Sequence, residues 1–128
     1  MSIKWIKVLF AICAFYDGLL GFVFLFIPAA LYRIAGVVPP NHYGYVQFPA
    51  LLLIIFGVMF LRIAADPVAR REQMVYGMAL KVSYFGLVFW YQVHGGVPSL
   101  WIPWAWSDVV FLLLFLMAWR QVSRPGAV

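Results

Sequence analysis

Four apolar segments, each long enough to cross a bilayer as a helix, account for most of this sequence. A helix needs about 20 mostly apolar residues to cross about 30 Å of hydrocarbon, and the segments at about 5–27, 45–62, 73–92 and 99–119 come close to that length. Only 10% of the 128 residues are charged, whereas a soluble domain has about 25%. The sequence therefore predicts an all-α, polytopic membrane protein, with one transmembrane domain over residues 1–128 that folds as an antiparallel four-helix bundle.

The basic residues lie on one side of this predicted topology. If the N-terminus is cytoplasmic, the outer loops contain only Arg33, and the cytoplasmic ends receive Lys4, Lys7, Arg62, Arg70, Arg71, Arg120 and Arg124. By the positive-inside rule we expect both termini in the cytoplasm, with the basic residues against lipid headgroups and no nucleic-acid partner. The first apolar run is longer than that of a cleavable signal peptide, so we expect it to remain as a span.

Three ionisable residues interrupt the apolar spans: Asp17, Lys81 and Asp108. At about 1.5 Å of rise per residue, they fall within a few ångströms of one level near the middle of the bilayer. Left unpaired, the three would cost on the order of 8 to 10 kcal/mol, so we expect them to pair inside the bundle. Tyr16 and Tyr84 lie beside them in the sequence and are further candidates for this buried polar network.

Two alternatives to this network stay open at this stage. Asp108 could cap the start of a shorter helix, although only about 12 residues would then remain before Arg120, too few to cross. Lys81 could extend its side chain toward the cytoplasmic interface and leave Asp17 neutral. If the network forms, it is either a structural clamp between helices or a functional site, such as a proton relay or the polar anchor of a ligand pocket.

Aromatic residues cluster at the predicted outer end of the spans, namely Tyr32, Tyr43, Tyr45, Trp90, Tyr91, Trp101, Trp104 and Trp106. An aromatic belt at the membrane interface explains such a cluster. The polar residues His42, Gln47, Gln92 and His94 lie nearby in the sequence and, together with Trp101 and Trp104, also suit a lipophilic ring ligand such as a quinone. The two histidines lack the spacing of a metal site, so we expect no metal and no tightly bound cofactor.

Several motifs of defined enzymes and transporters are missing from the sequence. It contains no P-loop, GxSxG, HExxH or CxxC motif, and no internal repeat. These absences favour a non-catalytic membrane subunit, or a component that binds a lipophilic ligand, in a redox or transport complex. Two alternatives are an oligomeric proton-coupled transporter or channel that uses the buried charges, and a membrane enzyme acting on a lipophilic substrate. The segment PAALYRIAGVVPPNHYG between the first two spans predicts a short interfacial helix.

Short sequence motifs resemble the small four-helix bacterial inner-membrane proteins grouped as DoxX-like. The resemblance rests on FYDGLLG in the first span, YVQFPALLLIIFG in the second, a lysine in the third and WSDVVF in the fourth. It implies a multi-pass protein of the bacterial inner membrane, with other membrane subunits or further copies as partners. Some members are linked to quinone oxidoreductase or redox-stress complexes. The family's polar positions correspond here to Asp17, Gln47, Lys81 and Asp108, and this chain lacks the cysteine pair of thiol-active relatives.

Overall fold

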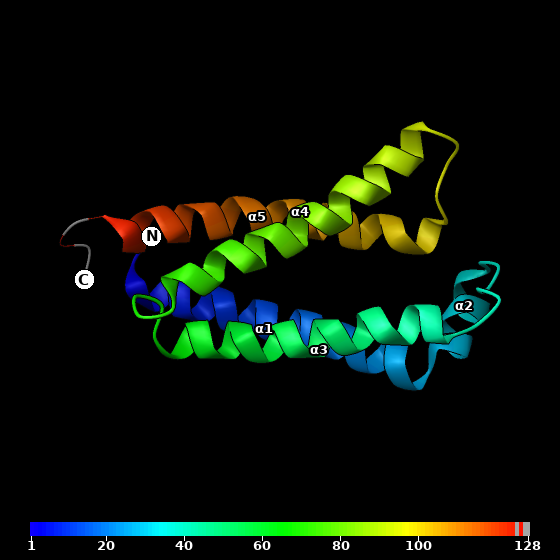
Figure 1. Cartoon of the computed structure of the whole chain (residues 1–128), viewed down its shortest axis with the longest axis horizontal. Helices are drawn as coiled ribbons and strands as arrows, with labels where there is room; N and C mark the ends of the chain where they lie inside the picture. The colour runs from blue at the N-terminus through cyan, green and yellow to red at the C-terminus, as the bar shows by residue number, and fades with distance from the viewer. Residues whose placement is uncertain (125, 127–128) are drawn as a thin grey trace.

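The fold was analysed in a computed structural model, which describes residues 1–124 and 126. These residues form helices α1 (Ile3–Phe26), α2 (Pro28–Ala35), α3 (Gly44–Ala65), α4 (Arg71–Val93) and α5 (Ile102–Ser123), with a short 3-10 turn, η1 (Ser99–Trp101), before α5. The four long helices run up and down the long axis of the molecule, and the start of α1 and the end of α5 lie at the same end of it (Figure 1). The all-helical prediction is confirmed, with helix ends that differ from the predicted ones by a few residues.

Local sequence sets where these helices begin and end. The Ser2 side chain caps α1 by accepting a hydrogen bond from the backbone N–H of Trp5 (3.4 Å). α1 ends at Phe26, and Pro28 then opens α2 as its first residue, where a missing N–H costs nothing. Gly36 ends α2 in the left-handed conformation (φ 66°), which a residue without a Cβ adopts easily. The predicted helix between the first two spans is therefore present as α2.

Among the described residues, three helical segments are long and apolar enough to cross a membrane: Ile3–Phe26, Gly44–Ala65 and Ser99–Ser123. Large apolar side chains on their outer faces are exposed, including Phe15, Leu19, Ile55 and Leu113. A soluble monomer rarely exposes so much contiguous apolar surface, so these faces indicate a membrane protein. α4, which corresponds to the predicted span 73–92, does not belong to this apolar set, so the fourth crossing stays a prediction.

The helices pack as two close pairs, α1 with α3 and α4 with α5, and contacts between the pairs are fewer. Glycines allow the first pair to approach closely. A Cβ added at Gly21 would lie 2.6 Å from the carbonyl oxygen of Ala50, and one at Gly57 would lie 3.1 Å from that of Ala14. At the end that holds the chain termini the two pairs share a core, in which the rings of Phe10 and Phe115 stack 4.5 Å apart.

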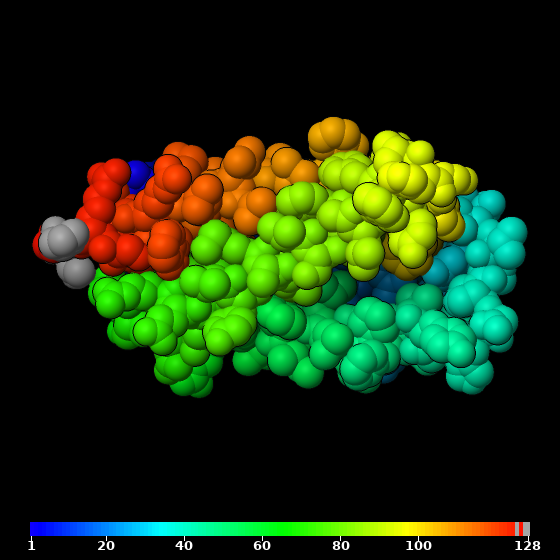
Figure 2. Space-filling model, turned by 45° about the horizontal axis from the view of Figure 1, so that its top comes forward, coloured from blue at the N-terminus to red at the C-terminus, as the bar shows by residue number. Residues whose placement is uncertain are grey.

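Toward the opposite end, the second half of α4 slopes away from α1 and α3 (Figure 1). In the space-filling view the surface is hollowed between the C-terminal half of α4 and the first half of α3, and α1 is visible at the bottom of the hollow (Figure 2). The fold is thus tightly packed at one end and open between the helix pairs at the other. The buried charges lie between these two regions.

Candidate functional site

Asp17, Lys81 and Asp108 form a buried ion-pair network, called the triad below. Lys81 Nζ donates to Oδ1 and Oδ2 of Asp17, each at 2.9 Å, and to Oδ1 of Asp108 at 3.0 Å. The three residues are at most 6% exposed, and each lies on a different helix: α1, α4 and α5. The predicted pairing is confirmed. Lys81 does not extend toward an interface, and Asp108 lies inside α5, well past the first residue of that helix.

The sequence around the triad explains why the charges meet. Cys13, Ala14 and Gly21 share the buried face of α1 with Asp17. Because these neighbours are small, the adjacent helices come close enough for a lysine and an aspartate to reach one another. Aromatic rings enclose the ammonium: Lys81 Nζ lies 5.1 to 5.8 Å from the ring centroids of Tyr16, Phe60 and Phe111. Contacts of this kind stabilise a cation that has lost its water.

With all three groups ionised, the triad has one more negative than positive charge, and Asp108 has the carboxylate oxygen that Lys81 leaves free. Lys81 has three N–H donors, and all three are directed at carboxylate oxygens. Both oxygens of Asp17 are engaged by Lys81, but Oδ2 of Asp108 accepts no hydrogen bond from a described residue. The Asp108 side chain is also the most accessible of the three, at 9% compared with 2% for Asp17 and 1% for Lys81.

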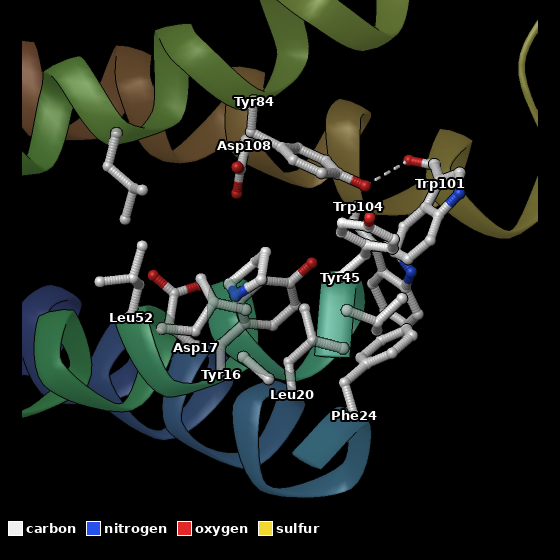
Figure 3. Close-up of a pocket in the computed structure, with 15 residues that line it drawn as sticks. Tyr16, Asp17, Leu20, Phe24, Tyr45, Leu52, Tyr84, Trp101, Trp104 and Asp108 are labelled. Atoms are coloured by element: carbon white, nitrogen blue, oxygen red, sulfur yellow. Dashed lines mark hydrogen bonds between the residues drawn. The ribbon is translucent and has the colours of Figure 1, made fainter. Parts of the chain in front are cut away.

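A cavity of about 380 Å³ begins at the triad and extends away from the chain termini. Asp17 and Asp108 lie at its inner end, and all four long helices contribute to its wall. The wall is mostly apolar, with the aromatic residues Tyr16, Phe24, Tyr45, Tyr84, Trp101 and Trp104 (Figure 3). The hollow in Figure 2 lies between α3 and α4, two helices that line the cavity, so the cavity opens sideways between the two helix pairs.

Two buried polar atoms in the cavity wall have no hydrogen-bond partner among residues 1–124 and 126: Trp104 Nε1 and Tyr16 Oη. The hydroxyl of Ser107 is a neighbour of Tyr16 and donates to the carbonyl oxygen of Pro103 (3.1 Å), and it makes no hydrogen bond with Tyr16 Oη in the described chain. An indole N–H can only donate, so Trp104 requires an acceptor. A buried polar atom without a partner costs about 1–3 kcal/mol, which a ligand with an oxygen or nitrogen acceptor would recover.

The other tyrosine predicted for the network has a different role. Tyr84 Oη donates to the backbone carbonyl of Trp101 (2.9 Å), which ties α4 to η1 across the cavity (Figure 3). Neither Tyr84 nor Tyr16 makes a hydrogen bond to the triad within the described chain. Both line the cavity instead. The tyrosines and the two predicted tryptophans, Trp101 and Trp104, therefore share one space with the two aspartates.

The remaining residues predicted for the outer mouth lie outside this cavity. Gln47 Nε2 donates to the carbonyl oxygen of Leu25 (3.1 Å), which joins α3 to the end of α1. His42 Nδ1 accepts from the backbone N–H of Gly44 (2.9 Å) at the start of α3. Gln92 is exposed, and the exposed ring of His94 stacks on Trp90 at 4.1 Å. The structure gives local roles to Gln47 and His42, and ligand binding by any of these four residues stays a prediction.

Several residues of the cavity wall were not predicted from the sequence. Leu20 and Phe24 follow Asp17 by three and seven residues, so they lie on the same face of α1. This helical spacing is the sequence signal from which Leu20 and Phe24 could have been predicted. Leu80 and Pro49 also line the cavity, but nothing in their sequence context distinguishes them from residues that face lipid.

Within the part of the chain that is described, no three His, Cys, Asp or Glu residues are grouped so that they could hold a metal ion. Cys13 is buried, and its Sγ lies 3.9 Å from Oδ2 of Asp17. No family model, curated protein or solved structure matches this chain. The case for a function therefore rests on the triad and the cavity.

Proposed function

We propose that this chain is a multi-pass protein of the bacterial inner membrane whose cavity binds a lipophilic small molecule. In this proposal all four long helices cross the bilayer and both termini are cytoplasmic. The protein acts as a non-catalytic, ligand-binding component of a membrane redox or transport complex. Its kinship with the DoxX-like proteins is part of the same proposal.

The observation that supports ligand binding best is an apolar cavity that ends on buried charges. Its volume of about 380 Å³ lies within the range of about 300–1,000 Å³ that small-molecule pockets occupy. Such pockets combine an apolar wall with a few polar groups that orient the ligand. Here those groups are Asp108 Oδ2, Trp104 Nε1 and Tyr16 Oη, which lack hydrogen-bond partners within the described chain.

The lateral opening supports a ligand that arrives from the lipid. Figure 2 shows a hollow between α3 and α4, and the cavity lining on α3 includes the exposed Tyr45. In the proposed topology this opening faces the hydrocarbon layer and the outer headgroups. A lipophilic molecule could then enter without crossing water.

The charge distribution supports the proposed topology. Both ends of the chain and the turn between α3 and α4 lie at one end of the molecule (Figure 1), and they carry all the predicted cytoplasmic basic residues. The most polar of the long helices, α4, can cross because Lys81 is neutralised by the acids of its neighbours. Arg33 on α2 lies at the opposite end.

A second candidate function is proton-coupled transport by an oligomer, and the free carboxylate oxygen of Asp108 favours it. A carboxylate with an unpaired oxygen beside a cavity can take up and release a proton, and buried acids of this kind mark proton pathways in transporters. A transporter of this kind would produce pH-driven flux in vesicles that contain only this protein. A subunit of a complex would produce none and would co-purify with a partner.

Native mass spectrometry of the protein, extracted gently from its own membrane, tests ligand binding. We expect a non-covalent adduct of small-molecule mass on the wild type and a strongly reduced adduct on Leu80→Trp, since Leu80 lines the cavity. Leu87→Trp is the matched control, because it makes the same change on the same helix at a position that is 61% exposed. An adduct that persists unchanged in Leu80→Trp would contradict binding in this cavity.

A further inference from the structure

We propose that the cavity selects a lipophilic organic cation, such as a substituted ammonium, which binds at Asp108 Oδ2 in competition with a proton. This inference rests on the proposed function, because it names the class of ligand that the same cavity takes. It follows from the charge of the triad, the free oxygen of Asp108 and the chemistry of the cavity wall.

The triad has an uncompensated negative charge that a bound cation would neutralise. Two carboxylates share one ammonium, and no other charged side chain among residues 1–124 and 126 lines the cavity. An uncompensated charge is costly away from water, so the site gains free energy when one positive charge joins it. That charge can approach from the cavity, because Asp17 and Asp108 line it, and the rings of Phe60 and Phe111 lie close to the Lys81 ammonium.

Geometry directs the incoming charge to Asp108 and away from Lys81. The ammonium of Lys81 touches Oδ1 of Asp108, so a second cation next to that oxygen would be repelled. Oδ2 is the oxygen of this carboxylate without a partner in the described chain, and Asp108 lines the cavity. A cation at Oδ2 is closer to the excess negative charge than to the lysine, so attraction exceeds repulsion.

The cavity wall also suits a cation. Of the aromatic residues that line it, Tyr16, Tyr84, Trp101 and Trp104 come from four different elements, so the cavity that Asp108 lines has aromatic rings on several sides. Aromatic faces attract organic cations, and tryptophan does so most strongly. Quaternary and alkylated ammonium groups are the ligands that such aromatic enclosures recognise. An anionic ligand would meet an excess of like charge at the inner end.

A proton is the alternative occupant of the same oxygen. The titratable and charged groups that face Asp108 are Asp17, Tyr16 and Cys13 from α1, and Lys81 and Tyr84 from α4. Among these, only Lys81 supplies a positive charge, and Asp17 already binds it through two hydrogen bonds. Protonation of Asp108 removes the excess charge as effectively as a bound cation does. Binding of a cation and binding of a proton are therefore mutually exclusive.

A matched pair of probes tests the inference on purified protein in nanodiscs. Benzyltrimethylammonium is a permanent cation, and neopentylbenzene is its neutral isostere, in which carbon replaces nitrogen. Because the cation cannot lose a proton, any pH dependence of its binding comes from the protein. Tryptophan fluorescence reports binding, and the cavity-filling variant Leu80→Phe, which adds no tryptophan, supplies the background for partition into lipid.

We expect the cation to bind the wild type at least about tenfold more tightly than the neutral probe at high pH, with an affinity that falls as the pH is lowered. In Asp108→Asn both the preference and the pH dependence should be lost, while the neutral probe still binds. Calorimetry of the wild type in buffers of different ionisation enthalpy should show proton release when the cation binds below the pH at which Asp108 ionises. This measurement does not depend on the folding of any variant.

Equal affinities for the two probes would overturn the inference, while binding of the neutral probe would leave the proposed ligand site intact. Failure of the cation to bind would also overturn it, and the adduct found by native mass spectrometry would then decide separately whether the cavity holds a ligand. Cation binding without proton release and without pH dependence would refute the competition at Asp108.

Discussion

Replacement of Lys81 by methionine is the most informative perturbation of this protein. Methionine keeps much of the length and apolar volume of the lysine side chain and removes its charge. In Lys81→Met, Asp17 and Asp108 lose their shared counterion, although both remain almost completely buried. The two acids must then bind protons or reach water, and each outcome opposes the native packing.

The expected cost follows from the distances in the triad. One attraction between unit charges about 3 Å apart is worth about 5 kcal/mol at an effective dielectric constant of about 20, and the cost of desolvating the ions offsets part of it. Loss of one partner of a buried pair destabilises proteins by about 3–5 kcal/mol, which we expect for Lys81→Met. Asp17→Asn leaves Lys81 paired with Asp108 and no net charge, so we expect a smaller loss of about 1–3 kcal/mol.

The double variant isolates the pair. Lys81→Met combined with Asp17→Asn leaves one carboxylate in place of two, so it should be more stable than Lys81→Met alone. We expect a coupling free energy of about 1–3 kcal/mol between the two sites. A double variant whose loss of stability equals the sum of the two single losses would show that Asp17 and Lys81 do not act as a pair.

Cys13 supplies the assay without any added label. It is the single cysteine of the chain, it is buried, and it lies one turn before Asp17 on α1. A thiol-reactive fluorophore should label it only when the helices separate. Labelling followed during heating, or during titration with a denaturing detergent, therefore reports the unfolding of each variant in the region of interest.

The other predictions use the same chain. Gly21→Ala should destabilise the packing of α1 against α3 by about 1–3 kcal/mol in the Cys13 assay, because its Cβ would lie 2.6 Å from a carbonyl oxygen of α3. Gly86→Ala is the control: a Cβ there meets nothing within 4 Å, so the variant should be neutral or slightly stabilising. Tyr84→Phe removes the hydrogen bond to η1 and should cost about 1 kcal/mol in the same assay. Membrane-impermeant maleimide should label Asn41→Cys but not Ser123→Cys in intact cells, and the reverse pattern would contradict the proposed orientation.

The triad was predictable because helix geometry is almost independent of tertiary context. A fixed rise per residue placed Asp17, Lys81 and Asp108 at one depth, and the cost of isolated charges required them to meet. The same reasoning predicted four long helices, and each one is present. It also counted residues 73–92 as a span, whereas α4 is not among the described helices that are long and apolar enough to cross a membrane.

The cavity was beyond sequence reasoning because it depends on how far apart the helix pairs stand. The angle of α4 decides whether Leu80 and Tyr84 face an open space or a packed core, and that angle follows from contacts along the whole helix. Local hydrogen bonds were also not predictable from the sequence. Gln47 and His42 are polar residues near the outer mouth, but a carbonyl oxygen of α1 and a backbone N–H of α3 occupy them.

The order in which the helices are synthesised sets the order in which the three charges of the triad become available. Asp17 is on α1, which leaves the ribosome first, and Lys81 on α4 follows, so these two can form a neutral pair before α5 exists. α5 is the last helix, and it brings Asp108. In the proposed topology the growing protein therefore reaches charge balance with α4, and α5 then adds one acid to a scaffold that is already neutral. The unbalanced charge, on which the proposed chemistry depends, is the last part to arrive.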